Sequence, residues 1–543
     1  MSGLPPEPRA QRIANGLLVA AVLLGAAWTL AQLLHFRYGR DQGIYHMVAV
    51  EMLDGGAPYR DAWDFKPPGI FLVFVLARLF GSSDTAIRIV EALGWALLIY
   101  AYALLTRRHV GSWLGGLVGG ALACLIHVEL EFWNTGQPES FAAVALAWAL
   151  VCATYEARPD DPRGERKQLA AWLGAGALYG VAFLMKPPLA GGIVVTWAIV
   201  VRRLGLARWR RPTAALVAGA AAPIVLTLLY FALHGALGDL YDTLAVFTPK
   251  YTAIDFRWGK LHEHFIHAFA DWLVAYSGVM ALGIGLALAL PPAGPRDREL
   301  VVHLLGAAFF PVLGVALQAK FFGYHFDTAL SLGAAVAGLG LWKLWTQLRG
   351  RWLALAPVYA ALVLALILGR TATKGPPGDF WERSAKRREW LGADPQRRRA
   401  LEDALYNVSG FEPVLNREAA LWLRDHSRPG EPVLVFGFEP TMYAIADRPP
   451  ATRYFYNVAQ RVDWASPSYR RRFLDDLTRR PPAAIAVETQ DRFPWVIGNR
   501  RSSAETLAVF PELSALLAAR YDKAGGNPRF DLYVRRSSGT SGI

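Results

Sequence analysis

The chain has 543 residues, of which 54% are hydrophobic and 19% are charged, and its formal net charge is +13. The charged fraction is below the ~25% of typical soluble domains, and long apolar runs exclude an ordinary soluble fold for most of the chain. Much of the Lys and Arg lies in short breaks between these runs. That placement follows the positive-inside pattern of membrane proteins, so we interpret the basic charge as topological and predict no nucleic-acid partner.

Apolar runs predict a polytopic α-helical membrane protein, because about 20 apolar residues are needed to cross the hydrocarbon core. About eleven spans are predicted, near residues 13–35, 85–106, 112–132, 139–156, 169–186, 188–203, 213–233, 272–290, 300–318, 326–345 and 352–369. We expect broken helices around Met185 and Tyr324. The run at 69–80 is too short to cross, and we expect it to lie in or to re-enter the membrane interface.

The basic loops predict an orientation for these spans. With the N-terminus in the cytoplasm, alternate loops hold the basic segments 107–108, 163–167, 202–211, 296–298 and 343–351, as the positive-inside rule requires. An odd number of spans then places residues 373–543 on the non-cytoplasmic side. We therefore predict a transmembrane module at 1–372 and a soluble extracytoplasmic domain at 373–543.

The unusual ionisable residues lie in the predicted outer loops. Asp41 follows the first span, and Lys66 precedes two prolines and the short apolar run. Ionisable groups at membrane depth are functional candidates by default, which favours a functional role for these two residues. Glu139 equally fits a carboxylate at a helix N-terminus. Lys186 and Lys320 equally fit snorkelling side chains at helix ends.

Other sequence patterns bear on the kind of chemistry. The segment His262-Glu263-His264-Phe265-Ile266-His267 lacks the spacing of zinc hydrolases, and we interpret it as the polar face of a surface helix. The sequence holds neither a P-loop nor a Rossmann glycine fingerprint where a cytoplasmic nucleotide could bind. This argues against ATP-driven transport and against a nucleotide-sugar donor.

The first outer loop carries a family resemblance. Asp41 is followed by Gly55-Gly56-Ala57-Pro58-Tyr59-Arg60-Asp61-Ala62-Trp63-Asp64-Phe65-Lys66-Pro67-Pro68-Gly69. This arrangement resembles the GT-C superfamily of lipid-carrier glycosyltransferases, and most of all its protein O-mannosyltransferase and lipid A aminoarabinose transferase branch. The resemblance implies a catalytic outer loop, an outer C-terminal domain and inversion at the anomeric carbon in a single displacement.

The resemblance also implies roles for particular residues. Asp41 matches the catalytic acid of the first loop, and Gln42 stands where many relatives have a second acid, which leaves Asp41 alone as the base. The family's Lys-Pro motif falls on Lys66, near the donor phosphate. The resemblance implies that Glu139 of the second outer loop and the pair Tyr324 and His325 are substrate-binding residues. Lys186 and Lys320 are further candidates for binding the donor phosphate or substrate. No cofactor is implied, and a divalent metal stays an open alternative that Gln42 weakens.

The chemistry of glycosyl transfer supports the same interpretation independently of the resemblance. A carboxylate can remove the proton of an attacking hydroxyl, and a cation can stabilise a leaving lipid phosphate. We therefore predict transfer of a sugar from a polyprenyl-phosphate carrier to a hydroxyl of a glycan, lipid or protein, on the outer face of a bacterial cytoplasmic membrane. The alternatives are a lipid or glycolipid transporter or flippase, which would place its odd residues near the midplane, and a catalytically inactive GT-C relative.

The C-terminal region predicts a small α/β layer. Strands are predicted at 432–437, 483–488 and 530–535, and helices at 380–404, 416–427, 468–479 and 504–520, with a strand pair at the end. The segment 436–443 resembles the loop at a strand end, where open sheets often bind ligands. We expect it either to cap the membrane cavity and contact the acceptor or to be purely structural.

Overall fold

The computed structural model describes residues 9–158, 160–254, 260–348, 379–408 and 410–536. Their contacts divide the chain into two compact units, which we call the helical unit (1–36, 77–227 and 258–385) and the mixed unit (37–76, 228–257 and 386–543). The first outer loop thus packs in the same unit as the C-terminal region. The predicted domain boundary at 372/373 and the predicted span 352–369 lie outside the described residues.

Seven helices of the described part are long and apolar enough to cross a membrane. They comprise α1 (Arg9–Ala31) with η1 (Gln32–His35), α4 (Asp84–Val110), α8 (Gly164–Met185), η3 (Pro187–Gly192) with α9 (Ile193–Leu204), α10 (Arg210–Leu233), α15 (Asp297–Gln318), and η8 (Gly323–Phe326) with α16 (Asp327–Gln347). All seven coincide with predicted spans. Hydropathy identifies them because a helix that faces lipid must be apolar along its whole length.

Three other predicted spans are not single long helices in the structure. The helices α5 (Leu114–Glu129) and α7 (Pro138–Ala153) are apolar but have only 16 residues each. The predicted span 272–290 is a bent pair: α13 (Leu261–Ala270) and η7 (Asp271–Ala275) meet α14 (Gly278–Ala289) at 94°. Ser277 begins α14 by accepting the backbone N–H of Met280 at 3.0 Å. The count of eleven spans therefore stays a prediction.

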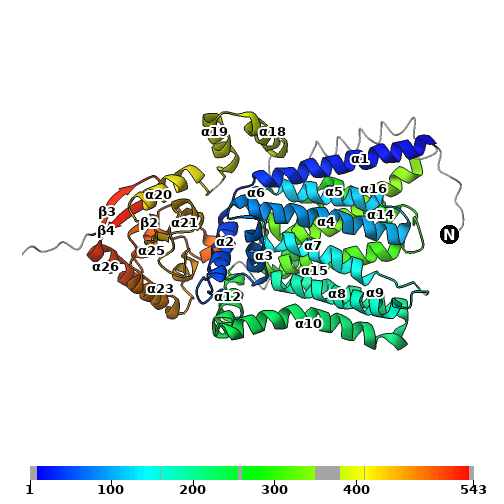
Figure 1. Cartoon of the computed structure of the whole chain (residues 1–543), viewed down its shortest axis with the longest axis horizontal. Helices are drawn as coiled ribbons and strands as arrows, with labels where there is room; N and C mark the ends of the chain where they lie inside the picture. Colours follow the sequence, from blue (N-terminus) through cyan, green and yellow to red (C-terminus); the bar gives the residue numbers. More distant parts are fainter. Residues whose placement is uncertain (1–8, 159, 255–259, 349–378, 409, 537–543) are drawn as a thin grey trace, which may run out of the picture. The chain divides into compact units, whose positions relative to one another are not determined.

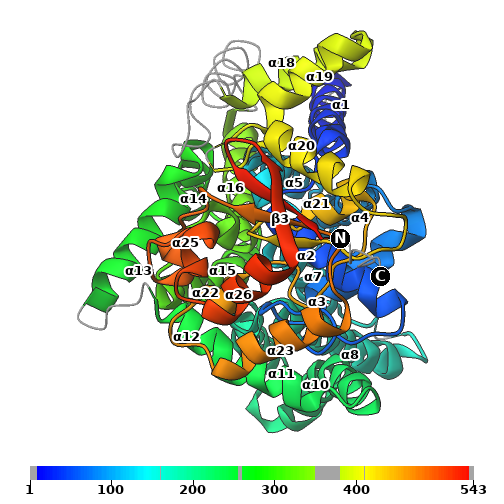
Figure 2. The same ribbon diagram turned by 90° about the vertical axis from the view of Figure 1, so that its left-hand side faces the viewer.

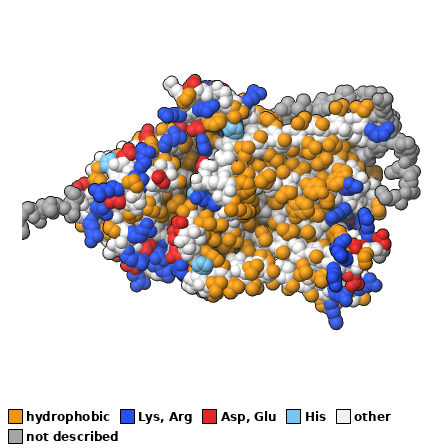
Figure 3. Space-filling view, in the orientation of Figure 1, with side chains coloured by type: hydrophobic (Ala, Val, Ile, Leu, Met, Phe, Trp, Pro, Cys, Tyr) orange, Lys and Arg blue, Asp and Glu red, His pale blue; other side chains and the backbone are white. Residues whose placement is uncertain are grey.

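The helices of the helical unit pack through small residues. Figure 1 shows α4, α5, α7 and α8 running side by side. A Cβ atom added at Gly119 of α5 would lie 2.8 Å from the carbonyl oxygen of Ala334 in α16, so the two backbones are in close contact. Small residues at helix interfaces permit such close approach in membrane proteins. Figure 3 shows hydrophobic side chains spread over a wide surface. Leu93 and Leu97 of α4 are among the exposed large hydrophobic side chains of this unit.

The predicted helix breaks are confirmed. Helix α8 ends at Met185, and the extended Lys186 connects it to η3, which begins with Pro187. Helix α15 is followed by Ala319, whose φ of 51° lies in the left-handed region, and η8 begins four residues later. Short elements complete the unit: η2 (Arg78–Phe80), α6 (Glu131–Asn134) and η4 (Leu206–Arg208). Both breaks leave a lysine, Lys186 or Lys320, at the end of a helix.

The mixed unit begins with the first outer loop. Helix α2 (Arg40–Leu53) is followed by an irregular segment and by α3 (Gly69–Ala77), which continues into η2 as the short apolar helix predicted at 69–80. A second segment adds α11 (Leu237–Tyr241), the π-helical turn η5 (Asp242–Phe247) and α12 (Thr248–Thr252). Trp63 is 1% exposed, and its ring packs against Phe247 of η5 and Tyr456 of the C-terminal region. Aromatic packing thus joins three distant parts of the sequence.

A four-stranded sheet organises the C-terminal part of the mixed unit. Its strands are β1 (Leu434–Phe436), β2 (Ala484–Glu488), β3 (Tyr521–Gly526) and β4 (Phe530–Arg535), in the order β1-β2-β4-β3. Strands β1 and β2 are parallel, and the other two pairings are antiparallel. Figure 2 shows β3 between α20 (Pro413–Asp425) and α26 (Pro511–Arg520). The predicted α/β layer, its three strands and its closing strand pair are confirmed.

Two predicted C-terminal helices are wrong as single helices. The segment 380–404 is α18 (Asp379–Gly392) and α19 (Pro395–Tyr406), and Asp394 caps α19 by accepting the backbone N–H groups of Gln396 and Arg397. The segment 504–520 is α25 (Ser503–Leu507) and α26, which begins at Pro511. A proline begins the second helix in both cases, because it lacks the N–H that a helix interior needs. The other helices are α21 (Thr441–Ala446), α22 (Val458–Arg461), α23 (Pro467–Arg479) and α24 (Pro494–Ile497).

Candidate active site

Asp41 lies in the first turn of α2, in the mixed unit. The N-cap residue is Gly39, and its N–H donates to Oε1 of Gln42 at 2.9 Å, which closes the start of the helix. Gln42 is fully buried. An uncharged amide is much cheaper to bury than a carboxylate, and its side-chain oxygen caps the helix, which accounts for a buried glutamine at position 42. Asp41 itself is favourably placed at a helix N-terminus.

The residue before Asp41 is tied to the C-terminal part of the same unit. Arg40 donates from Nε to Oε1 of Glu439 at 2.8 Å, and its guanidinium lies 4.8 Å from the ring centre of Phe493. Glu439 belongs to the segment 436–443 that the sequence singles out. The structure therefore shows a contact within the chain for this segment, while an acceptor contact stays a prediction.

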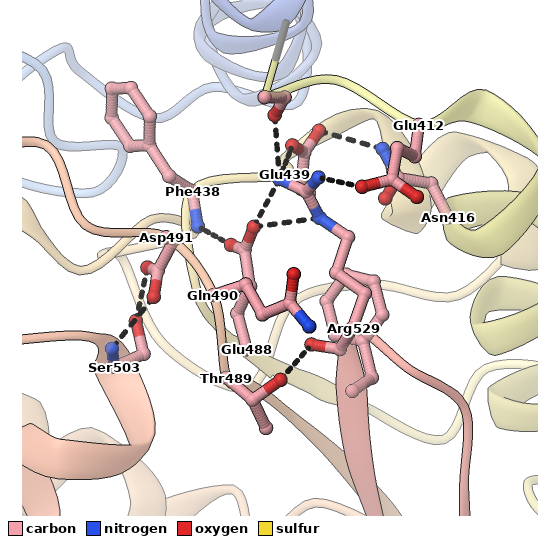
Figure 4. A network of polar contacts seen from close by, with 12 residues as sticks. Glu412, Asn416, Phe438, Glu439, Glu488, Thr489, Gln490, Asp491, Ser503 and Arg529 are labelled. Carbon is pink, nitrogen blue, oxygen red and sulfur yellow. Dashed lines mark hydrogen bonds and ion pairs between the residues drawn. The ribbon is translucent and has the colours of Figure 1, made fainter. Parts of the chain in front are cut away.

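Glu439 belongs to a buried network of opposite charges (Figure 4). Arg529 lies between two carboxylates and contacts Glu488 at 2.6 Å and Glu439 at 3.1 Å, while Asn416 donates to Glu439 at 2.9 Å. Burial, with the nearby charge of Glu488, raises the pKa of Glu439 to about 7, although Arg40 opposes the shift. The paired arginines compensate the charges, which is the condition under which buried ions are tolerated.

The loop that carries Lys66 is fixed through its backbone. Tyr59 donates from its hydroxyl to the carbonyl oxygen of Lys66 at 2.8 Å, and the N–H of Lys66 donates to Asp64 at 3.4 Å. Asp64 is 1% exposed and accepts the hydroxyl of Tyr456 at 2.6 Å. Burial raises the pKa of Asp64 to about 6; Lys66 lowers it and Asp41 raises it. Asp64 therefore lies within electrostatic reach of both Lys66 and Asp41.

Asp64 is a candidate that sequence reasoning missed. Asp64 stands in the first-loop segment 55–69, two residues before Lys66, but the sequence analysis predicts no role for it. The signal available in the sequence was an acid beside the lysine in a loop next to apolar helix. Its burial and its bond to Tyr456, 392 positions further along the chain, depend on the fold.

Glu139 and Lys186 form an ion pair in the helical unit. Glu139 is the second residue of α7, after Pro138, and its Oε1 lies 2.6 Å from Nζ of Lys186 at the end of α8. The side chain of Glu139 is 1% exposed and that of Lys186 is 18% exposed. The pairing gives Lys186 a specific contact inside the protein and places a buried negative charge at the start of α7.

Lys320, Tyr324 and His325 lie together at the start of η8. All three are buried, at 6%, 9% and 4% exposure. Nδ1 of His325 donates to the carbonyl oxygen of Lys320 at 2.6 Å, and the rings of Tyr324 and His325 are 4.3 Å apart and nearly perpendicular.

A polar core connects these two groups of the helical unit. Asp327, at the start of α16, accepts from Ser140 of α7 and from Nδ1 of His127 at 2.8 Å each. Thr328 donates to the carbonyl oxygen of Glu139 at 2.7 Å. The helices α7 and α16 thus hold Glu139 near the segment of Tyr324 and His325.

The same polar core continues into α4. His127 lies 3.2 Å from Glu91, which pairs with Arg88 at 2.8 Å, and all three are fully buried. Sequence reasoning missed Arg88, Glu91, His127 and Asp327, although charges within predicted spans are themselves a functional signal. The seven predicted site residues therefore form two groups: Asp41 and Lys66 in the mixed unit, and the other five in the helical unit.

The described part of the chain holds no group of three or more His, Cys, Asp or Glu side chains placed to bind a metal ion. His262 and His267 are exposed residues of α13, in line with the surface helix predicted for this segment.

Comparison with known proteins finds one family that part of the chain resembles. Residues 66–231 match the family described as dolichyl-phosphate-mannose-protein mannosyltransferase. The chain is related to the GT-C glycosyltransferases. The match begins at Lys66 and includes Glu139 and Lys186, and it confirms the resemblance predicted from the first outer loop. No curated protein sequence matches the chain significantly.

Two solved ArnT structures share the fold of this chain. The ArnT of Cupriavidus metallidurans bound to undecaprenyl phosphate matches with a TM-score of 0.52 and 17% identity, over 98% of this chain and 99% of that one. Its apo state matches with a TM-score of 0.53 and 17% identity, over 96% and 98% of the two chains. The apo oligosaccharyltransferase of Archaeoglobus fulgidus matches with a TM-score of 0.42 and 14% identity, over 89% and 71%.

Proposed function

We propose that this GT-C relative transfers a sugar from a polyprenyl-phosphate carrier to a hydroxyl acceptor on the outer face of a membrane. The observation that carries the proposal is the arrangement of the first outer loop. Asp64 interacts electrostatically both with Asp41, a carboxylate at a helix N-terminus, and with Lys66, in a loop fixed by buried hydrogen bonds. A buried carboxylate with a raised pKa beside a lysine is typical of catalytic sites.

The proposed step is a single displacement. The acceptor oxygen attacks the anomeric carbon while its proton passes to Asp41, and the bond between that carbon and the phosphate oxygen breaks. Negative charge develops on the leaving lipid phosphate, and Lys66 is the cation proposed to stabilise it. The configuration of the sugar inverts. The step needs neither a nucleotide nor a cofactor, and the proposal includes no metal.

The donor class follows from relatives. The matched family is described by a dolichyl-phosphate-linked mannose donor, and an ArnT with this fold was solved with undecaprenyl phosphate bound. Both carriers are polyprenyl phosphates. In the helical unit, Lys186 and Lys320 at the helix breaks and His325 in η8 supply further positive or protonatable groups suited to a phosphate, with Glu139 beside Lys186 and Tyr324 beside His325.

The proposed setting is the bacterial cytoplasmic membrane, with residues 373–543 on the outer side. The support is the basic character of alternate loops, which sets the orientation of membrane helices. A glycan, a lipid or a protein hydroxyl would be presented on that side. The segment 436–443 is proposed to lie near the acceptor.

The test is donor turnover by purified full-length protein in detergent. A panel of polyprenyl-phosphate sugars would be offered with a cell-envelope extract as the source of acceptors, and the released polyprenyl phosphate measured. We expect turnover of at least one donor by the wild type and a loss of about 10²- to 10⁴-fold in Asp41→Asn, the range for removing a general base. Asp54→Asn is the matched control, because Asp54 is an exposed residue at the other end of α2.

Two results would contradict the proposal. Turnover that survives in Asp41→Asn would place the base elsewhere. A folded wild type that neither binds nor consumes any donor of the panel would favour a lipid transporter or flippase, or an inactive relative. Transport of labelled lipid in reconstituted vesicles would then separate those two alternatives.

A further inference from the structure

The backbone of Lys66 is held from both sides. Its carbonyl oxygen accepts the hydroxyl of Tyr59 at 2.8 Å, and its N–H donates to Asp64 at 3.4 Å. The second contact, from a side chain to the N–H two residues further on, is an Asx turn. Pro67 then restricts the backbone that follows. The loop therefore fixes the place from which the Lys66 side chain extends.

Tyr59 is held in a strained conformation. Its φ of 70° lies in the left-handed region, which a bulky side chain rarely adopts. The N–H of Tyr59 donates to the carbonyl oxygen of Ala62 at 2.7 Å, and its ring stacks on Phe231 at 5.6 Å. Strain that surrounding contacts maintain is concentrated at functional sites. Here it directs the Tyr59 hydroxyl at Lys66.

Asp64 is held from the C-terminal part of the mixed unit. The hydroxyl of Tyr456 donates to it at 2.6 Å, and Tyr456 is fully buried against Trp63, the neighbour of Asp64 in the chain. A buried carboxylate is expensive unless it has hydrogen-bond donors and nearby positive charge. The titratable and charged groups that interact with Asp64 are Tyr456, Lys66, Asp41 and Tyr59, and burial together with Asp64 raises the pKa of Tyr59.

We propose that Asp64 is a positioning residue of the transfer reaction and supplies a second carboxylate beside Asp41. Held by Tyr456, it fixes the backbone of Lys66 and keeps a negative charge within reach of both Lys66 and Asp41. This inference rests on the proposed function, because the role of Lys66 is to meet the donor phosphate. It also gives the C-terminal region a role in the reaction, since Tyr456 holds the donor-binding loop in place.

The test compares full-length Asp64→Asn, Asp64→Glu and Tyr456→Phe with the wild type. Tyr454→Phe is the matched control, because Tyr454 packs on the same Trp63 ring while the hydroxyl that donates to Asp64 belongs to Tyr456. Steady-state turnover of the preferred polyprenyl-phosphate sugar would be measured from pH 5 to 8.5. Binding of undecaprenyl phosphate would be measured separately, with Lys66→Ala as the reference for a lost phosphate contact.

We expect Asp64→Asn and Tyr456→Phe to lower kcat/KM about tenfold to 100-fold, the range for losing a charged or supporting hydrogen bond at a site. Asp64→Glu should restore part of the activity, and Tyr454→Phe should stay within about twofold of the wild type. Because burial raises the pKa of Asp64 to about 6, the wild-type profile should bend near that pH, and the bend should be absent in Asp64→Asn. A merely structural side chain would leave the profile unchanged.

The outcomes separate this inference from the proposed function. Wild-type protein that neither binds undecaprenyl phosphate nor turns over a donor would overturn both. An active wild type whose Asp64→Asn variant keeps its kcat/KM and its pH profile would overturn the positioning role alone. If Asp64→Asn does not fold, Tyr456→Phe decides the matter, because it keeps the aromatic ring and removes only the donated hydrogen bond.

Discussion

Arg40 and Glu439 form a buried ion pair across 399 positions of the sequence, with Nη2 of the arginine 2.5 Å from Oε1 of the glutamate. The side chains are 6% and 0% exposed. Arg40 immediately precedes Asp41, so the helix that presents the proposed base is anchored in the C-terminal part of the mixed unit. This anchor links the stability of the C-terminal sheet to the geometry of the candidate site.

Breaking this pair should destabilise the protein. We expect Arg40→Gln to lower the free energy of unfolding by about 1–3 kcal/mol, because removing one partner leaves a buried charge and Arg529 compensates only part of it. Thermal unfolding in detergent would be measured for Arg40→Gln, Glu439→Gln and the double variant. The three values together give the coupling free energy between the two side chains. Arg37→Gln is the control: its pair with Glu402 is exposed and should contribute under about 1 kcal/mol. Equal effects at Arg37 and Arg40 would contradict the anchor.

The contact between Gly43 and Thr441 gives a second prediction. A Cβ atom at Gly43 of α2 would lie 2.7 Å from Cγ2 of Thr441, so Gly43→Ala should destabilise the protein by about 1–3 kcal/mol through overpacking. Adding Thr441→Ser removes that methyl group and should recover part of the loss. Gly25→Ala is the control, since no atom lies within 4 Å of its added Cβ, and a helical alanine there should be neutral or slightly stabilising. Melting temperatures that show no recovery in the double variant would refute the contact.

The pair of Glu139 and Lys186 should act as one unit in catalysis. We expect Lys186→Met and Glu139→Gln each to lower turnover about tenfold to 100-fold, and the double variant to lose less than the product of the two, because each residue compensates the charge of the other. Lys167→Met is the matched control, since Lys167 forms an exposed pair with Asp161. Strictly multiplicative losses would show that the two residues act independently.

Stability should fall as the pH rises. Burial raises the pKa of Asp64 to about 6 and the pKa values of Glu439 and Asp491 to about 7. The folded state therefore holds these protons more tightly than the unfolded state. The stability this contributes is fully present below their ordinary pKa values near 4 and is lost as the pH rises through about 6 to 7. Unfolding temperatures measured from pH 5 to 8 should decrease; a flat or rising series would contradict these shifts.

Much of the architecture could be predicted because its signals are local. The spans at α4, α8, α10 and α15 are continuous apolar runs, and any helix that faces lipid must have one. Strands β1, β2 and β4 are buried and apolar or alternating, so they stand out between amphipathic helices. Strand β3 was not assigned a range because five of its six residues are exposed and two are glycines, which leaves no apolar pattern to detect.

The residues of the candidate site also divide into those with a local sequence signal and those without one. Asp41, Lys66 and Glu139 are ionisable groups beside apolar runs, and the first-loop motif that contains Lys66 is short and contiguous, so the sequence alone indicates these residues and the family. Asp64 is in that motif too, but a carboxylate in a loop is usually solvated. Its importance follows from burial, which a single sequence does not display.

By itself, the sequence determined that this protein is a membrane helix bundle with an α/β C-terminal region and a first loop that resembles the GT-C superfamily. These features could be predicted because hydropathy and short motifs depend only on consecutive residues. Only the tertiary structure decided which polar and charged side chains pair with one another. Arg40 pairs with Glu439, Asp64 with Tyr456, and His127 with Asp327, over separations of 399, 392 and 200 positions. Such pairs form because a buried polar group needs a partner in three dimensions, and the fold, rather than nearness in the chain, supplies it.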